Sequence, residues 1–383
     1  MPSTGVPVNF GEQWRVMSID PWALHGQFPH RILAPTLAWL LGMGGDRWMT
    51  FLQGVNVAML ASAFLVSWRR GGAFVDGALV SLAIALTAAV QMYKVHWVGY
   101  ADPLCYTLFF CSMLAVRVPL VFWPLWLANL FQHELAGFLL PWLWWMRRRE
   151  DARWRLDLIC VAVAMVVYLA YYLLVKARVQ QTYSADYFLS HPLFPGGTLA
   201  VWVLAAVHWV VAFGPVLAML AWHQHRRASG SERWHLWLVL LGVLTIFCIA
   251  FDWQRHSNLI VLPLVVAATS VTRGSWRNRA IFAGLIALGA VLMVVWPPWS
   301  PSAWPTSAMS NIGLLVQSGV VIDLDPDPAP DRVDFGFGPL SATTDRWLPA
   351  IWPWLWPVAA IGLAFWVLGL LLAKKLPRPT ATS

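Results

Sequence analysis

Charged residues are scarce in this sequence. Asp, Glu, Lys and Arg make up 11% of its 383 residues, while 59% are hydrophobic. A soluble domain carries roughly 25% charged residues, so this composition excludes an ordinary soluble protein. We predict an all-α, polytopic helical membrane protein. Its net charge of +8 then reports membrane topology, because Lys and Arg collect in cytoplasmic loops, and it does not point to a nucleic-acid partner.

Cysteines are few as well, and several common motifs are missing. The cysteines lie in apolar stretches without paired spacing, which excludes a disulfide framework and a zinc site. No glycine-rich phosphate-binding loop is present, so P-loop and dinucleotide-binding enzymes are not indicated. Residues 1–30 are too polar for a signal peptide, and we expect an internal helix to drive membrane insertion.

Apolar stretches predict about 9 to 11 helices that span the membrane fully or in part. The stretch at 118–146 is too long for one span and is interrupted by Gln132, His133 and Glu134, so we expect two short legs joined by a polar turn. A shorter helix is predicted at 103–116. The remaining predicted spans cover residues 48–67, 73–93, 156–175, 199–222, 235–251, 259–271, 280–296 and 351–373.

Basic residues gather at every second connection, which places those connections and the C-terminus in the cytoplasm. Four regions follow: an outer interfacial segment at 1–47, a multispan core at 48–296, an outer loop at 297–349, and a final helix with a basic tail at 350–383. We expect the apolar segment 32–43 to lie on the outer surface, the alternative being a short first span. The acidic, proline-rich loop is better explained by solvation than by a hard-cation site.

Polar residues concentrate at the predicted outer ends of the helices, whereas the cytoplasmic turns carry mostly Arg. This sidedness indicates a working face, because ionisable residues are costly in a membrane and mark functional sites by default. The turn at 252–256, for example, places three ionisable groups between two apolar runs. The outer set comprises Asp20, His25, His30, Arg31, Lys94, His96, Asp102, His133, Glu134, Asp186, His191, Asp252, Arg255 and His256.

Each of these residues also has a plain structural explanation. Glu134 is either a base, a metal ligand or a binder of sugar hydroxyls, or a carboxylate neutralised by water or by Arg255. Asp102 precedes a proline, so helix capping explains it and catalysis is the less expected role. Arg255 is either an ion-pair partner of Asp252 or a bidentate phosphate ligand. For Lys94, a side chain that extends to the membrane–water interface is a better explanation than anion binding.

Four segments together share a pattern with a known superfamily. Residues 28–35 (Phe-Pro-His-Arg-Ile-Leu-Ala-Pro), the Asp102-Pro103 pair, the His133-Glu134 pair and residues 252–255 resemble bacterial members of the GT-C glycosyltransferase superfamily. The resemblance is distributed over residues 15–265. It implies an enzyme of the bacterial inner membrane that transfers a sugar from a polyprenyl-phosphate donor to an acceptor on the extracytoplasmic face. Membrane lipid and other membrane proteins are the implied partners.

The resemblance also implies roles for individual residues. Asp20 falls in the segment that supplies a base or an acceptor-holding acid, and Arg31 would be the local phosphate partner. The chain departs from the pattern because no spanning helix is visible before this segment. A divalent cation, Mg²⁺ or Mn²⁺, is the cofactor that such chemistry admits, and no metal ligand is assigned. The candidate catalytic residues are Asp20, Asp102 and Glu134, and the candidate substrate-binding residues are Arg31, Lys94, His96, His133, Asp252, Arg255 and His256.

Two other functions fit the same composition. A transporter or lipid-handling protein would line a pathway with these charges, but such proteins often have repeated halves and charges near the midplane. Here most charges lie at the outer ends and no duplicated half is evident, which favours the enzyme. A non-catalytic scaffold or assembly subunit would use the Trp-rich surface to bind other membrane proteins.

Overall fold

A computed structural model describes residues 9–24, 28–87, 89–91, 99–150, 153–179, 210, 213–227, 232–247, 256–295 and 360–375. All secondary structure in these ranges is helical, which confirms the predicted all-α class for the described part of the chain. Four candidate site residues lie outside these ranges, namely Lys94, His96, Asp252 and Arg255. The predicted outer loop at 297–349 lies outside them too.

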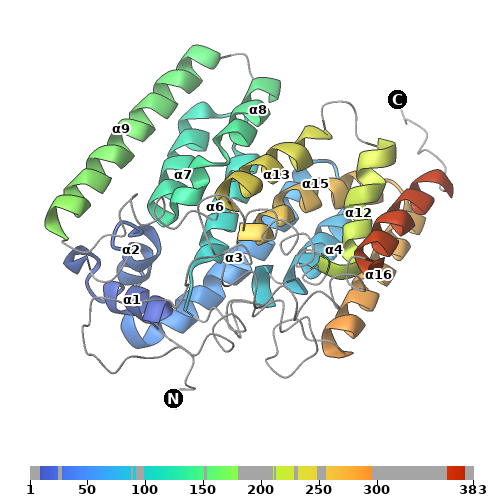
Figure 1. The fold of residues 1–383 in the computed structure, drawn as a ribbon, viewed down its shortest axis with the longest axis horizontal. Helices are drawn as coiled ribbons and strands as arrows, with labels where there is room; N and C mark the ends of the chain where they lie inside the picture. Colours follow the sequence, from blue (N-terminus) through green and yellow to red (C-terminus); the bar gives the residue numbers. More distant parts are fainter. Residues whose placement is uncertain are drawn as a thin grey trace, which may run out of the picture.

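The first half of the chain builds a bundle around a long helix, α3 (Figure 1). Trp48 begins α3, and its indole Nε1 donates to the carbonyl of Gly99, 3.0 Å away, which fixes this end of α3 beside the start of α6. The elements are α1 (Asn9–Met17), η1 (Pro21–Ala23), α2 (Leu33–Leu40), η2 (Gly45–Arg47), α3 (Trp48–Arg69), α4 (Phe74–Ala85), α6 (Asp102–Leu114), α7 (Pro119–Gln132), η3 (Glu134–Gly137), α8 (Leu140–Glu150) and α9 (Trp154–Arg178).

The predicted pair of short legs is confirmed by α7 and α8. The backbone leaves the helical conformation at His133, which is extended with φ −162° and ψ 127°, and one turn of 3-10 helix follows. Trp126 closes the turn, because its indole Nε1 donates to the carbonyl of Ala136 at 2.9 Å. The polar run at 132–134 thus ends an otherwise apolar helix, as the sequence indicates.

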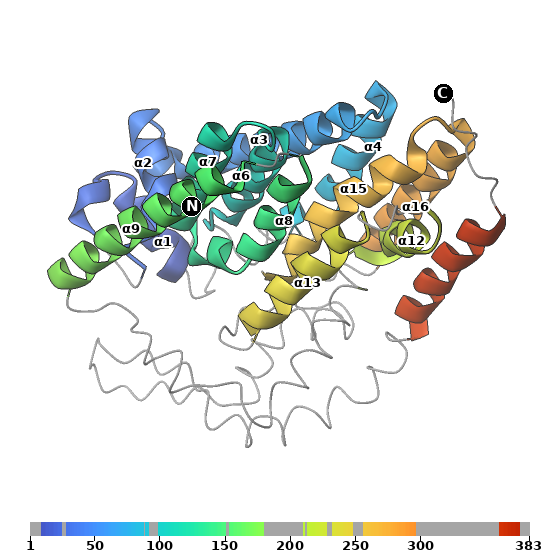
Figure 2. The same ribbon diagram turned by 90° about the horizontal axis from the view of Figure 1, so that it is seen from above.

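The second half packs around α15, of which every residue except Ser270 is buried. α15 contacts α4, α12, α13 and α16 and crosses the middle of the molecule (Figure 2). The elements of the second half are η4 (Gly214–Val216), α12 (Leu217–Trp222), the π-helical turn η5 (His223–Arg227), α13 (Trp234–Phe247), η6 (Asn258–Ile260), α15 (Val261–Thr272) and α16 (Trp276–Val295). Residues 360–375 form a further helix.

Two helical stretches in the described ranges are long and apolar enough to cross a membrane, at Gly45–Arg69 and Trp154–Arg178. The second contains α9, which runs along one edge of the molecule (Figure 1) and has only 11% of its most apolar window buried. Its exposed side chains include Ile159, Val166 and Leu174. Helices α4, α6, α13 and α15 are apolar but shorter than a full span.

Ion pairs with buried carboxylates join neighbouring helices. The Arg147 Nε lies 3.1 Å from Asp157 Oδ1, and both side chains are fully buried. Asp76 receives two hydrogen bonds from Arg279, at 2.7 and 2.9 Å. The start of α16 packs against α4 and brings Arg279 to the carboxylate.

Candidate functional site

The ends of α6 and α7 and the loop before α2 meet at a group of ionisable side chains. We call Asp102, His133, Glu134, His30, Arg31 and His256 the polar cluster. Asp102 is the first residue of α6, His133 ends α7 and Glu134 opens η3. All but Glu134 are buried, and the Glu134 side chain is one-third exposed. Residues from 30 to 256 thus converge, and ionisable groups at this burial need partners or a function.

Gln132 holds three of these elements together. Its Oε1 accepts a hydrogen bond from the Ala34 N–H at 3.2 Å, and its Nε2 donates to the carbonyl of Ala101 at 3.0 Å. One buried amide therefore ties the end of α7 to the first turn of α2 and to the residue before Asp102. Its removal leaves the buried Ala34 N–H without this partner, whereas the Ala101 carbonyl still accepts from the Leu104 N–H at 3.0 Å.

Glu134 is the anionic centre of the cluster. Arg31 Nε donates to its Oε2 at 2.9 Å, Arg31 Nη2 donates to its Oε1, and His30 Nε2 lies 3.3 Å from Oε2. Burial alone would raise the pKa of Glu134, but Arg31, His133 and His30 outweigh burial and hold this pKa well below its usual range. Glu134 is therefore ionised at neutral pH, and so weak a base is poorly matched to proton abstraction there.

His133 lies between the two carboxylates. The Leu135 N–H donates to its Nδ1 at 3.3 Å, which places the proton of a neutral ring on Nε2. Nε2 lies 3.9 Å from Asp102 Oδ1, and Nδ1 lies 3.5 Å from Glu134 Oε2. The His256 ring meets that of His133 edge to face at 5.8 Å between centroids. His133 therefore lies within 4 Å of an acidic side chain on each side.

Aromatic side chains border the cluster. The guanidinium of Arg31 lies over the Phe28 ring at 4.0 Å from its centroid, and His30 meets the Tyr172 ring at 5.4 Å. Tyr172 belongs to the apolar, outward-facing α9, and it precedes the end of that helix at Arg178 by about 9 Å along the axis. The cluster therefore lies beside α9, near one end of it.

The structure places the sequence-predicted residues in three groups. Asp102, Glu134, Arg31, His133 and His256 are together in the cluster. Asp20 is exposed, and the interaction described for its carboxylate is a cap on η1, where it accepts from the Trp22 N–H at 3.1 Å. Lys94, His96, Asp252 and Arg255 lie outside the described residues.

One sequence-based explanation needs correction, and the structure adds partners for two other residues. Asp102 does not cap α6, because the N-cap is Ala101 and no side-chain capping bond is formed. Glu134 is paired with Arg31, whereas Arg255, its expected partner, lies outside the described residues. Arg31, expected as a phosphate partner, directs its Nε and Nη2 to Glu134. The sequence offered no local signal for this pair, because 103 positions separate its members.

Sequence reasoning missed Gln132 and Tyr172 and counted His30 only among the outer polar residues. The three-residue run Gln132-His133-Glu134 was the available signal for the glutamine, since all three interrupt the same apolar stretch. Within the described ranges, no group of three or more His, Cys, Asp or Glu side chains is arranged to hold a metal ion.

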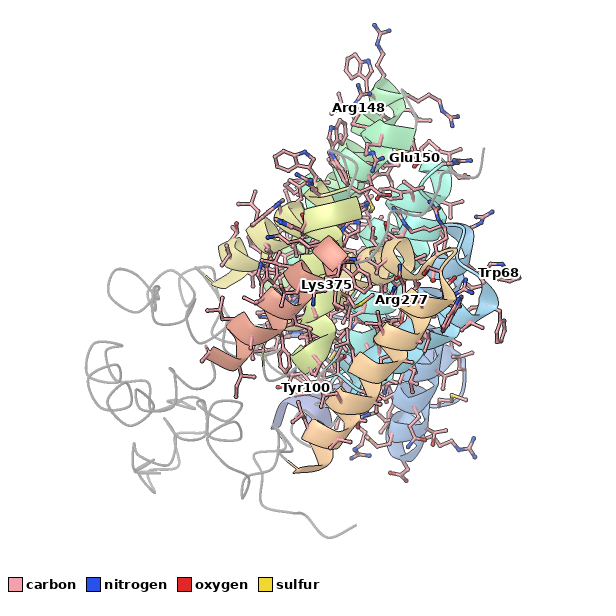
Figure 3. The ribbon with its side chains drawn as sticks, turned by 90° about the vertical axis from the view of Figure 1, so that its right-hand side faces the viewer. Trp68, Tyr100, Arg148, Glu150, Arg277 and Lys375 are labelled. Atoms are coloured by element: carbon pink, nitrogen blue, oxygen red, sulfur yellow. The ribbon has the colours of Figure 1, made fainter. Side chains whose placement is uncertain are left out.

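The cluster is separate from the basic end of the molecule. In Figure 3, Arg148 and Glu150 at the end of α8 lie at the top of the view, whereas Tyr100, just before α6, lies well below them. Comparison of the chain with protein-family models, with curated proteins and with solved structures found no match. The chemistry of the cluster therefore carries the functional argument.

Proposed function

We propose that this chain is an integral membrane glycosyltransferase-like enzyme. It transfers a sugar from a polyprenyl-phosphate donor to an acceptor hydroxyl at the extracytoplasmic face, and the polar cluster is its site. The observation that carries the proposal is the convergence of Asp102, His133 and Glu134 with Arg31 at one end of the helix bundle. Buried ionisable groups gathered in this way are typical of functional sites.

The residue types fit the chemistry of glycosyl transfer. The acceptor oxygen bonds to the anomeric carbon of the sugar, its proton passes to a base, and the bond from that carbon to the phosphate oxygen breaks with both electrons on the phosphate. Asp102 takes the proton, with His133 at 3.9 Å as its neighbour. Glu134 is ion-paired and too weak a base, so it positions Arg31 and His133. The cationic groups of the cluster stabilise the leaving phosphate.

The surroundings of the cluster suit a lipid-linked donor. The exposed apolar surface of α9 is expected to face lipid, because large contiguous apolar surfaces are unusual on soluble proteins. Tyr172 on the same helix borders His30, 5.4 Å between ring centroids. A polyprenyl chain lying along α9 would bring its phosphate to the level of the cluster. The shorter apolar helices complete a polytopic core, and the Arg-rich connections face the cytoplasm.

Transfer of labelled sugar in proteoliposomes tests this proposal. The purified chain is reconstituted and supplied with radiolabelled polyprenyl-phosphate sugars and a mixture of lipid and glycan acceptors. We expect transfer by the wild type, loss of transfer with Asp102→Asn, and retention with Asp20→Asn, because Asp20 caps η1. Loss with Asp20→Asn and retention with Asp102→Asn would move the chemistry to the residue that the superfamily resemblance favours. Normal transfer by both variants contradicts the site.

A non-catalytic assembly subunit is the second candidate. It is favoured by α9, whose exposed apolar face suits a protein partner as well as lipid. On that account the polar cluster only ties helix ends together. Absence of transfer with every donor, combined with co-purification of a membrane protein that is lost when Ile159 and Val166 are replaced by Ser, would support it.

A further inference from the structure

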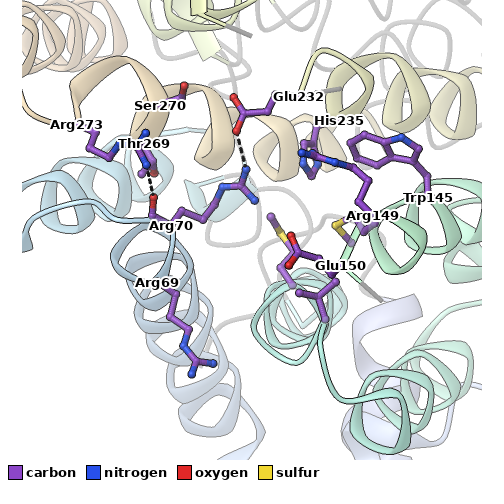
Figure 4. Close-up of a pocket in the computed structure, with 13 residues that line it drawn as sticks. Arg69, Arg70, Trp145, Arg149, Glu150, Glu232, His235, Thr269, Ser270 and Arg273 are labelled. Carbon is purple, nitrogen blue, oxygen red and sulfur yellow. Dashed lines mark hydrogen bonds and ion pairs between the residues drawn. The ribbon is translucent and has the colours of Figure 1, made fainter. Parts of the chain in front are cut away.

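A cavity of about 250 Å³, shown in Figure 4, lies at the opposite end of α6 from the polar cluster. It is bordered by the C-terminal ends of α3, α8 and α15 and by the start of α13. Helix α6 links the two places, because Asp102 begins it in the cluster and Met113 near its end lines the cavity. Its 13 residues put the sites roughly 20 Å apart. We call this the arginine cavity, after Arg69, Arg70, Arg149 and Arg273 in its lining.

Two carboxylates also line the cavity, and each already has a cationic partner. Glu232 Oε1 lies 3.3 Å from Arg70 Nη2, and its Oε2 lies 3.6 Å from His223 Nε2. Glu150 pairs at 3.1 Å with Arg117, which does not line the cavity. The negative charge of the lining is therefore committed to other cations, at least in part.

The remaining three arginines are held in place without a carboxylate partner in the described part of the chain. Arg273 Nη1 donates to the Arg70 carbonyl at 3.1 Å, and Arg69 Nη1 donates to the Leu114 carbonyl at 3.4 Å. Arg149 lies over the Trp145 ring, 5.2 Å from its centroid. These contacts orient the guanidinium groups but leave their charge uncompensated. Guanidinium stays protonated at any physiological pH, so the excess charge is permanent.

The electrostatics of Arg70 agree with this excess. Burial lowers the pKa of Arg70, and the neighbouring Arg149 and Arg273 lower it further, against the opposing effect of Glu232 and Glu150. Basic residues are retained in cytoplasmic loops, which explains why these connections contain Arg. That rule does not explain why several of the arginines converge on the arginine cavity. Arg277 lies on the same predicted side and is exposed, as Arg149 and Arg273 are, but it lines no part of this cavity.

We propose that the arginine cavity binds a phosphate group, as a phosphomonoester or a diphosphate, through Arg69, Arg149 and Arg273. Planar guanidinium groups match phosphate oxygens with paired hydrogen bonds. The cavity is smaller than the roughly 300–1,000 Å³ of sites for drug-sized ligands, which suits a headgroup or inorganic diphosphate. The phosphate comes either from an anionic lipid of the adjacent leaflet or from a soluble donor. This site is independent of the proposed transferase chemistry.

Two binding measurements on the purified full chain test the proposal. Calorimetric titration with inorganic pyrophosphate reports a soluble ligand. Liposome flotation reports binding to a lipid headgroup. The chain is supplied in a detergent that can be diluted away, and its binding to phosphatidylcholine liposomes is compared with and without phosphatidic acid. We expect binding in at least one arm, weakened by added salt because the contact is ionic. Binding only to phosphatidic acid assigns the lipid source, and binding of pyrophosphate assigns the soluble one.

The discriminating variant is Arg149→Gln/Arg273→Gln, with Arg155→Gln/Arg277→Gln as its matched control. Both pairs remove the same charge from the same predicted side, and all four residues are exposed, so the pairs differ in that only Arg149 and Arg273 line the cavity. Removing one charge-assisted hydrogen bond to phosphate lowers affinity about tenfold, so the cavity pair should weaken binding roughly 100-fold and the control pair less than threefold. Arg149→Lys/Arg273→Lys, which keeps charge and fold, should fall between them. Absence of binding in both arms, or equal weakening by the two Gln pairs, overturns the proposal.

Discussion

The ion pair between Glu134 and Arg31 gives the sharpest test of how the polar cluster is held. The change Glu134→Gln keeps the shape of the side chain and removes its charge, while Arg31 stays 6% exposed. Removing one partner of a buried ion pair costs about 3–5 kcal/mol, because the other charge is left uncompensated. The Glu134 side chain is 33% exposed, so water screens part of this loss. We therefore expect the free energy of unfolding to fall by roughly 2–3 kcal/mol.

The pair itself is isolated by a double-mutant cycle in detergent. Glu134→Gln, Arg31→Gln and the double variant are unfolded with denaturant, and Asp46→Asn serves as the control because its pair with Arg15 is at the surface. We expect the double variant to lose at least about 1 kcal/mol less than the sum of the single losses, and the control to match the wild type. Losses that add within about 0.5 kcal/mol would refute the reasoning, because independent sites behave in that way.

The same pair predicts a pH dependence with a definite sign. The pKa of Glu134 in the folded chain is held well below its usual range, whereas an unfolded Glu titrates near about 4.3. The stabilisation by its charge is therefore present above about pH 4.3 and is lost as the pH falls through the folded pKa. The difference in free energy of unfolding between the wild type and Glu134→Gln receives a constant contribution from the Glu134 charge between about pH 5 and pH 8. In stronger acid this difference should shrink. An advantage that grows in acid would contradict this sign.

Two further changes test contacts outside the ion pair by denaturant unfolding. Gln132→Leu leaves the buried Ala34 N–H without its partner and removes one of two donors from the Ala101 carbonyl, so the free energy of unfolding should fall by about 1–3 kcal/mol. A loss under about 0.5 kcal/mol would show that the amide does not hold these helix ends together. Asp157→Asn leaves the fully buried Arg147 without its carboxylate and should cost about 3–5 kcal/mol, while an unchanged midpoint would contradict the buried pair.

Local patterns predicted much of the helical framework. The apolar run that became α9 was placed at 156–175, and the structure has Trp154–Arg178. The break between α7 and α8 was placed at Gln132, His133 and Glu134, because consecutive polar side chains end an apolar stretch, and the chain leaves the helix at His133. These successes rest on periodicity and polarity within a single segment.

Long-range pairings could not be predicted from the sequence. Arg31 and Glu134 are 103 positions apart, and Asp76 and Arg279 are 203 apart. A local pattern carries no information about which of many arginines reaches a given acid, because that choice depends on how helices pack. Asp102 illustrates the same limit at short range. An acid before proline suggests a cap, yet α6 begins at Asp102 itself.

The most direct test of the account is a comparison of sugar transfer with donor binding in the Asp102→Asn variant. The amide keeps the size of the side chain but accepts no proton, and loss of a general base lowers turnover by about 10²–10⁴-fold. The account predicts a loss of at least about 100-fold in turnover with polyprenyl-phosphate sugar, donor affinity within a few-fold of the wild type, and normal turnover with Asp20→Asn. Wild-type turnover by Asp102→Asn would contradict it.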